Sequence, residues 1–314
     1  MPEPEPLPRG VLSGSLVFAE VAREGPLACP LRLVYLATGE ERRFPQDTLG
    51  CSVSVPRRGS AVAKSIGDEL TPTNELRYRI IDPGHAERPF HEVWARDGRL
   101  SWTLDGGRVL WCFGPGGREL ELGRTSHRFR TCADGYTADG ERFYLRGRRL
   151  VVGHRLVLER PAAIDEAVWS TNGSVALVVG GRRLERWDDG GLDGVAVLPE
   201  GFAFSPTYFS PDNCAAIVLA PTQEVYLIDL GCFRGRDPSA IGSGPCGRRL
   251  SRIVRCFPWF RPSSFFGHNA NLGTWSPDGN WIAVVEADAI VFHRVVGHYA
   301  SVRWGVRAAT LAWR

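Results

Sequence analysis

The chain has 314 residues, of which 43% are hydrophobic, so it is long enough to bury a large core. Its 36 glycines and 22 prolines are typical of a β protein with many turns. The net charge of +3 is too small to indicate nucleic acid or another polyanion as the partner. No stretch approaches the roughly 18–20 consecutive apolar residues of a transmembrane helix.

Residues 1–10 form a polar leader rich in Pro and Glu, which lacks the basic n-region and apolar h-region of a signal peptide. The sequence as written therefore predicts a cytoplasmic protein. The alternative is a periplasmic or other extracytoplasmic protein from which an N-terminal leader has been removed. We expect residues 11–314 to form a single domain.

A ten-residue unit recurs along the chain and consists of a large apolar residue, a tight turn and a short apolar strand. The copies begin at Val53, Trp102, Tyr136, Trp169, Phe209, Trp275 and Trp304. Most of the spacings between them lie near the roughly 40–50 residues of one four-stranded propeller blade. A unit that cannot bury its own apolar face must stack on its neighbours, so the repeat predicts a ring of blades.

The clearest copy is Trp-Ser-Pro-Asp-Gly-Asn-Trp-Ile-Ala-Val at 275–284. Pro277 suits the second position of a type I turn, and Gly279 accepts the positive φ that closes a hairpin. The apolar residues on either side of this turn are typical of paired antiparallel strands. Further strands follow some copies, at 225–231, 34–39 and 76–84, which gives four strands per unit.

These motifs resemble the TolB-type propeller repeat, which is related to the WD-repeat class. The resemblance rests on Ser-Pro-Asp-Gly followed by an apolar strand at 275–284, and on a second copy at 209–213. It also rests on outer strands that end in Asp-Leu-Gly or Ala-Thr-Gly. The copies at 102, 136 and 169 are degenerate. The resemblance implies an all-β propeller that binds proteins or small ligands.

The two ends of the chain are expected to share one blade. Segments 15–21, 31–36 and 41–44 are predicted to be its second, third and fourth strands, and the missing first strand is predicted around Ser301–Trp304. Closure of this kind hides both edges of the ring. Seven blades are predicted. Six is the alternative, because the copy at Val53 lacks the turn residues.

Eight cysteines permit disulfides, but four pairs allow 105 connectivities and the sequence does not choose among them. Cys29 and Cys51 flank one pair of predicted outer strands. Cys112 and Cys214 lie inside predicted strands, and we interpret them as small buried apolar residues.

An insertion at about 233–268 interrupts the repeat just before its clearest copy. It carries seven arginines against one aspartate, together with clustered aromatic residues. Loops of this length without structure of their own are functional or disordered. One interpretation is a docking arm for another protein, and the other is a long blade loop whose aromatic residues cap the core. The candidate binding residues are Arg248, Arg249, Arg252, Arg255, Trp259, Phe260, Phe265 and Phe266.

Searches for catalytic and metal sites identify no residues, and no cofactor is expected. Gly242-Ser-Gly-Pro-Cys-Gly247 formally matches a dinucleotide loop but lacks the strand and helix that this loop requires. We place His85, His91 and Glu92 in a solvated loop. We interpret Asp188, Asp189 and Asp193 as turn formers, because they lack the spacing of a calcium loop.

Two functions remain. The first is a non-catalytic propeller scaffold that binds another protein, or a small ligand, with no nucleic acid expected. The second is a propeller enzyme of the lyase or hydrolase type, with its site at the mouth of the central channel. A regular supply of His, Asp, Glu or Arg from successive repeats would indicate an enzyme, and the sequence does not provide it.

Overall fold

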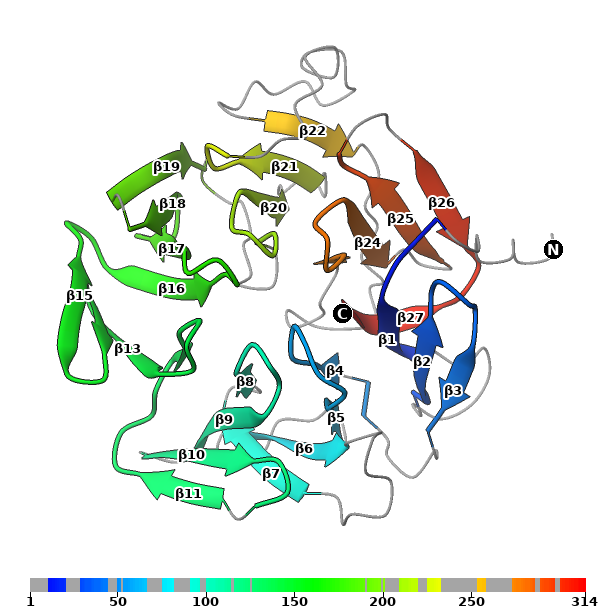
Figure 1. Cartoon of the computed structure of the whole chain (residues 1–314), viewed down its shortest axis with the longest axis horizontal. Coiled ribbons are helices and arrows are strands. Elements are labelled where there is room, and N and C mark those ends of the chain that lie inside the picture. Colours follow the sequence, from blue (N-terminus) through cyan, green and yellow to red (C-terminus); the bar gives the residue numbers. More distant parts are fainter. Residues whose placement is uncertain are drawn as a thin grey trace.

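The computed structural model describes residues 11–20, 29–44, 50–51, 53–66, 75–81, 91–96, 100–113, 116–124, 126–189, 191–198, 200, 209–219, 225–232, 253–257, 273–285, 289–296 and 300–314. Within these ranges all regular secondary structure is β-strand. The strands form seven antiparallel sheets arranged around a ring (Figure 1), which we number as blades 1 to 7 in chain order.

The strands of each blade run in order from the centre of the ring outward. Blade 1 consists of β27 (Ala308–Trp313), β1 (Ser15–Glu20), β2 (Leu31–Tyr35) and β3 (Glu41–Arg43). Blade 2 consists of β4 (Val53–Ser54), β5 (Val62–Ser65), β6 (Glu75–Ile81) and β7 (His91–Arg96). Blade 3 consists of β8 (Leu100–Trp102), β9 (Arg108–Phe113), β10 (Gly116–Glu121) and β11 (Ser126–Phe129). Blade 4 consists of β12 (Gly135–Tyr136), β13 (Arg142–Arg146), β14 (Arg149–Val152) and β15 (Arg155–Glu159).

Blade 5 consists of β16 (Ile164–Trp169), β17 (Val175–Val179), β18 (Arg183–Asp188) and β19 (Gly191–Val197). Blade 6 has three described strands, β20 (Ala215–Leu219), β21 (Val225–Asp229) and β22 (Ile253–Phe257). An isolated bridge between Phe209 and Ala216 stands where the other blades have their innermost strand. Blade 7 consists of β23 (Gly273–Trp275), β24 (Trp281–Val285), β25 (Ile290–Arg294) and β26 (Ser301–Trp304). Six sheets are therefore complete four-stranded blades, and the copy at Val53 forms one of them.

The core lies between the blades. Seven clusters of buried residues each join two neighbouring blades, from blades 1 and 2 round to blades 7 and 1. In the cluster that joins blades 7 and 1, Phe18 packs edge-on against Trp304, with ring centroids 5.5 Å apart. A blade buries its apolar surface only against its neighbours, so the ring has to close for every blade to be covered.

The ring closes within blade 1, as the sequence predicts, but with a different strand. β27 supplies the innermost strand and pairs with β1, so that Val17 lies opposite Ala312. Ser301–Trp304, which was expected to play this part, is instead the outer strand of blade 7 and pairs with β25. Burial explains the difference, because β27 carries the buried Leu311 and Trp313, whereas Ser301 and Arg303 are exposed.

The insertion also differs from the sequence prediction, because it is not entirely loop. Its residues Ile253–Phe257 form β22, the outermost strand of blade 6, in which Arg255 lies opposite Leu227. This strand completes the blade that begins at Phe209. The wide spacing between the copies at Phe209 and Trp275 therefore contains a structural strand as well as the inserted segments.

Three disulfides link cysteines that are 18 to 22 residues apart: Cys29–Cys51, Cys112–Cys132 and Cys214–Cys232. The interpretation of Cys112 and Cys214 as unpaired apolar residues was wrong. Each lies at one end of a hairpin whose chain brings a second cysteine alongside, with Cα atoms 5.4 and 5.0 Å apart. In the described part of the chain, no helix is long and apolar enough to cross a membrane.

Candidate binding face at the centre of the ring

The connections between the first and second strands of the blades surround the centre of the ring on one face. In blades 3, 4, 5 and 7 each connection has five residues, and residues 210–214 form the equivalent segment in blade 6. Neighbouring connections touch. A Cβ added at Gly106 would lie 2.6 Å from the carbonyl oxygen of Arg58, and one at Gly59 would lie 2.7 Å from that of Asp105. Together with the connection of blade 2, these segments form the candidate functional face, which we call the turn ring.

A shared pattern of hydrogen bonds builds these turns. A Ser or Thr at the first position donates its hydroxyl to an Asp or Asn at the third, as Thr103 does to Asp105 over 2.6 Å. The same carboxylate accepts the Gly107 N–H, and together these donors hold the pKa of Asp105 below its ordinary value. At Asp278, burial raises the pKa, but hydroxyl and N–H donors outweigh it and lower the pKa. These carboxylates therefore remain ionised and serve to fold the turn.

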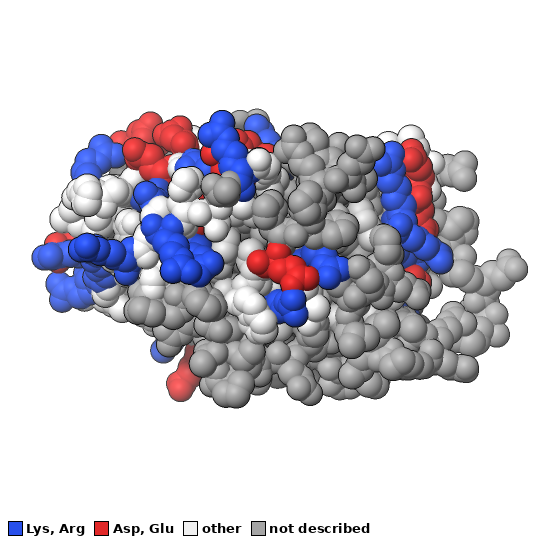
Figure 2. Space-filling model, turned by 90° about the horizontal axis from the view of Figure 1, so that it is seen from below, with Lys and Arg blue, Asp and Glu red and all other residues white. Residues whose placement is uncertain are grey.

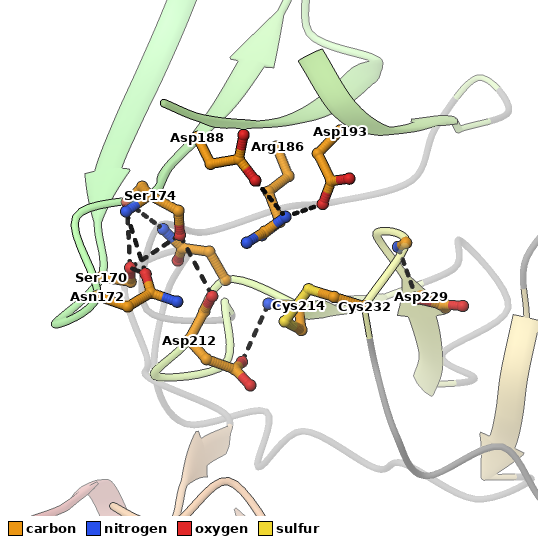
Figure 3. Close-up of polar contacts among 12 residues, drawn as sticks. Ser170, Asn172, Ser174, Arg186, Asp188, Asp193, Asp212, Cys214, Asp229 and Cys232 are labelled. Atoms are coloured by element: carbon orange, nitrogen blue, oxygen red, sulfur yellow. Dashed lines mark hydrogen bonds and ion pairs between the residues drawn. A yellow bond between two sulfur atoms is a disulfide. The ribbon is translucent and has the colours of Figure 1, made fainter. Parts of the chain in front are cut away.

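The turns of blades 5 and 6 are joined by side-chain hydrogen bonds (Figure 3). Asn213, which is fully buried, adopts a positive φ of 58° at the position that Gly279 occupies in the clearest repeat. Its Nδ2 donates to the carbonyl oxygens of Val168 at 2.9 Å and Ser174 at 3.1 Å, both in blade 5. In return, the Ser174 hydroxyl donates to the carbonyl oxygen of Asp212 over 3.3 Å. The polar groups of this junction hold two blades together.

Blade 2 is the exception in the turn ring, because its connection, Val55–Ala61, has seven residues. The longer turn carries Arg57, whose Nη1 donates to the carbonyl oxygen of Pro211 at 3.1 Å. Blades 2 and 6 are not neighbours, so this side chain reaches across the centre of the ring. Burial lowers the pKa of Arg57 to about 10, and the nearby Asp212 carboxylate partly offsets the effect. Arg57 is therefore still a cation at neutral pH.

The candidate binding residues of the insertion fall largely outside the described part of the chain. This holds for Arg248, Arg249, Arg252, Trp259, Phe260, Phe265 and Phe266. Arg255 is placed by its backbone within β22. The structure therefore does not test whether these residues lie together, and their role as a docking arm remains a prediction.

Two other groups singled out in the sequence are now placed. His91 and Glu92 belong to β7 rather than to a loop, and the Glu92 carboxylate pairs with Arg77 and, at 2.9 Å, with Arg79. Asp188 and Asp193 flank the turn between β18 and β19, and both pair with Arg186 (Figure 3). Across the described ranges, no three His, Cys, Asp or Glu side chains are grouped so that they could hold a metal ion.

Sequence reasoning did not identify Arg57. The signal was nevertheless present, because the copy at Val53 reads Val-Pro-Arg-Arg-Gly where the other copies have a short turn centred on Asp-Gly or Asn-Gly. A basic pair in a turn that is longer than its equivalents marks a position where the repeat has been altered.

The four-stranded blades, the Ser-x-Asp-Gly turns and the shared terminal blade define a β-propeller of the TolB-like and WD-repeat-like class. No protein-family model matches the chain, and no curated protein matches it either.

Solved structures do match. Hsv2p of Kluyveromyces lactis has a TM-score of 0.55 and 10% identity, over 94% of this chain and 96% of that protein. A putative 6-phosphogluconolactonase of Bacteroides uniformis has a TM-score of 0.54 and 13% identity, over 95% of this chain and 98% of that protein. TolB of Acinetobacter baumannii has a TM-score of 0.47 and 13% identity, over 97% and 67% of the two chains. At these identities the likenesses show the fold alone.

Proposed function

We propose that the chain is a non-catalytic β-propeller scaffold that binds another protein, or a small ligand. One observation carries the proposal: the described polar side chains of the turn ring are used to build it. The Asp105 and Asp278 carboxylates accept hydrogen bonds within their own turns, Asn213 ties blade 6 to blade 5, and Arg57 is bonded to Pro211 across the ring. This arrangement supports a rigid presenting surface, since such groups would otherwise have to be free to meet a substrate.

The binding segment proposed within this scaffold is the insertion at 233–268. It flanks β22 on both sides in the sequence, so its basic and aromatic residues belong to the outer edge of blade 6. Aromatic and arginine side chains are the residue types most enriched among the energetically dominant contacts of protein interfaces. A protein partner with an acidic surface fits the seven arginines of this segment.

The test must spare β22, because deleting the whole insertion would remove a blade strand. One variant replaces Trp259, Phe260, Phe265 and Phe266 with Ser, and a second replaces Arg248, Arg249 and Arg252 with Ser. A matched control replaces the exposed Arg148 and Arg155 of blade 4 with Ser. We expect a partner captured by the wild-type chain from extract of its own organism to be lost with both arm variants and retained with the control. Capture that is equal for all four proteins would exclude the arm.

We further propose an extracytoplasmic location. The support is the set of three disulfides, because such bonds persist in oxidising compartments and are rare in the cytosol. This differs from the cytoplasmic location that the N-terminal sequence alone predicts.

The alternative is a propeller enzyme with its site at the channel mouth. It is motivated by Arg57, which places a cation at the centre of the turn ring, and by the likeness to the putative lactonase. Incubation with 6-phosphogluconolactone separates the two hypotheses. Turnover above the spontaneous rate that disappears in Arg57→Gln would establish the enzyme and overturn the non-catalytic proposal. We expect no turnover above background from either protein.

A further inference from the structure

A cavity of about 310 Å³ lies between the outer parts of blades 2 and 3, away from the turn ring. Its floor is apolar and buried: Val93 on β7 is 4% exposed, Trp111 on β9 is 4% exposed and Leu120 on β10 is 1% exposed. Its rim is polar and consists of Glu92, Arg118, Arg124 and Ser126. The volume is within the range of small-molecule sites, which combine apolar walls with a few convergent polar groups.

The pleat of β10 gives the cavity its charge. Side chains alternate between the two faces of a strand, so Arg118 and Leu120 share the face toward the cavity, and Glu119 and Glu121 lie on the other. Glu119 accepts a hydrogen bond from the Tyr136 hydroxyl of blade 4 at 2.7 Å, which holds that acid on the far side. The cavity face of β10 therefore presents a guanidinium beside apolar surface.

A second observation indicates an anion. Arg118 lies directly opposite Arg128 on β11, so two guanidinium groups share one face of an antiparallel pair. Like charges in this position repel each other, and an anion bound between or beside them would relieve the repulsion. Figure 2 looks onto this side of the ring, where basic side chains are prominent with acidic ones between them.

The acids at the rim are already neutralised. Glu92 is paired with Arg77 and Arg79, and these partners hold its pKa below the ordinary value, so it stays ionised within its own ion pairs. Glu121 is paired with Arg124 at 3.1 Å. The described charged side chains that line or flank the cavity are five arginines (Arg77, Arg79, Arg118, Arg124 and Arg128) and two glutamates (Glu92 and Glu121). The balance favours an anionic ligand.

We propose that this cavity is a binding site for a small apolar molecule that carries a carboxylate, with its apolar body against Trp111 and Leu120 and its carboxylate at Arg118. A guanidinium matches the planar carboxylate geometrically and retains its charge at every physiological pH. The floor supplies the apolar contact that a bare inorganic anion could not use. The site is separate from the insertion and from the turn ring, and it would stand if the docking arm proved wrong.

The test uses isothermal titration calorimetry of the full chain with 2-naphthoate, with uncharged 2-naphthylmethanol and with acetate. We expect 2-naphthoate to bind with a submillimolar Kd that rises with salt. The uncharged analogue should bind at least tenfold more weakly, and acetate should give no measurable heat. Equal affinity for 2-naphthoate and 2-naphthylmethanol, or no binding of 2-naphthoate at 5 mM, would overturn the proposal.

The variants separate the carboxylate contact from a general loss of fold. Arg118→Gln should weaken 2-naphthoate binding about tenfold or more. Arg124→Gln, in an exposed turn where folding is not at risk, should weaken it about threefold. Arg155→Gln, in the outer strand of blade 4, should bind like the wild type. Wild-type affinity in Arg124→Gln together with a folded Arg118→Gln, or an equal loss in Arg155→Gln, would show that the arginines of this cavity do not hold the ligand.

Discussion

Leu16 lies directly opposite Trp313, so a strand from the N-terminal part of the chain is hydrogen-bonded to a strand from the C-terminal part. The bond between the Ser15 N–H and the Arg314 carbonyl oxygen, at 2.7 Å, extends the same junction. All other complete blades are made from one continuous segment. The stability of the whole ring therefore depends on this junction, because the blades on either side lose a neighbour if it opens.

Replacement of Trp313 should consequently be among the most costly single changes in the chain. Its side chain is 5% exposed, packs edge-on against Phe292 with centroids 5.4 Å apart, and donates from Nε1 to the Ser13 carbonyl oxygen. We expect Trp313→Ala to lower the free energy of unfolding by about 3–5 kcal/mol in urea denaturation. Trp94→Ala, at a position 39% exposed, should cost less than about 1 kcal/mol. Similar losses in the two variants would contradict this view of the closure.

The sequence predicted the ring and its shared blade well, because the Ser-x-Asp-Gly turn is local chemistry that repeats. It did not predict which C-terminal strand closes the ring. Trp304 and Trp313 both end short apolar segments, and only the partner strand distinguishes them. It also missed Arg57, since the contact with Pro211 joins blades that are far apart in the sequence. Disulfide pairing depended on how each hairpin returned, which composition does not encode.

Asn213 tests how the turn ring is held together. Its positive φ favours glycine, whereas its side chain bonds two carbonyl oxygens of blade 5. Asn213→Gly keeps the backbone relaxed and loses the two bonds, so we expect a loss of about 1–2 kcal/mol. Asn213→Ala also adds strain and should cost about 2–4 kcal/mol. Thermal and urea unfolding would give the order, and a glycine variant that is less stable than the alanine variant would contradict it.

The disulfides lead to a prediction about thiol content. Six of the eight cysteines are paired, so protein isolated from its native compartment and unfolded without reductant should expose no more than two thiols to Ellman's reagent, compared with eight after reduction. The double variant Cys214→Ser with Cys232→Ser should lose about 2–4 kcal/mol of stability, because the unfolded chain is no longer constrained. Eight thiols before reduction would exclude the extracytoplasmic proposal.

Arg57 is expected to reduce the stability of the fold that it spans. Burial disfavours its charged form, and its partner is a neutral carbonyl oxygen that contributes about 1 kcal/mol. We expect Arg57→Met to raise the free energy of unfolding by about 1 kcal/mol at pH 7, since the methionine fills similar space without a charge to desolvate. Arg58→Met, at the exposed neighbouring position, should change it by less than about 0.5 kcal/mol. A destabilised Arg57→Met would show that the bond across the ring outweighs the cost of burial.

Glu185 provides a pH-dependent test of the junction between blades 4 and 5. Its side chain is fully buried and accepts hydrogen bonds from Arg160 at 2.8 Å, from Arg183 at 2.5 Å and from the Trp187 indole N–H at 2.9 Å. Burial alone would raise the pKa of Glu185, but these donors outweigh it and hold the pKa below its ordinary value of 4.5. The carboxylate therefore stabilises the fold fully above about pH 4.5, and this contribution is lost as the pH falls through the lowered pKa.

Glu185→Gln removes that charge and leaves Arg160 without its buried partner. We expect the variant to lose about 2–4 kcal/mol at pH 7, and the difference from the wild type to shrink in urea unfolding at pH 4 and pH 3. Glu159→Gln is the matched control, because Glu159 pairs with Arg149 at 3.2 Å on the exposed edge of blade 4. Its cost should stay below about 1 kcal/mol. A difference for Glu185→Gln that is constant from pH 7 to pH 3, or that widens in acid, would mean that the paired carboxylate is not what holds blades 4 and 5 together.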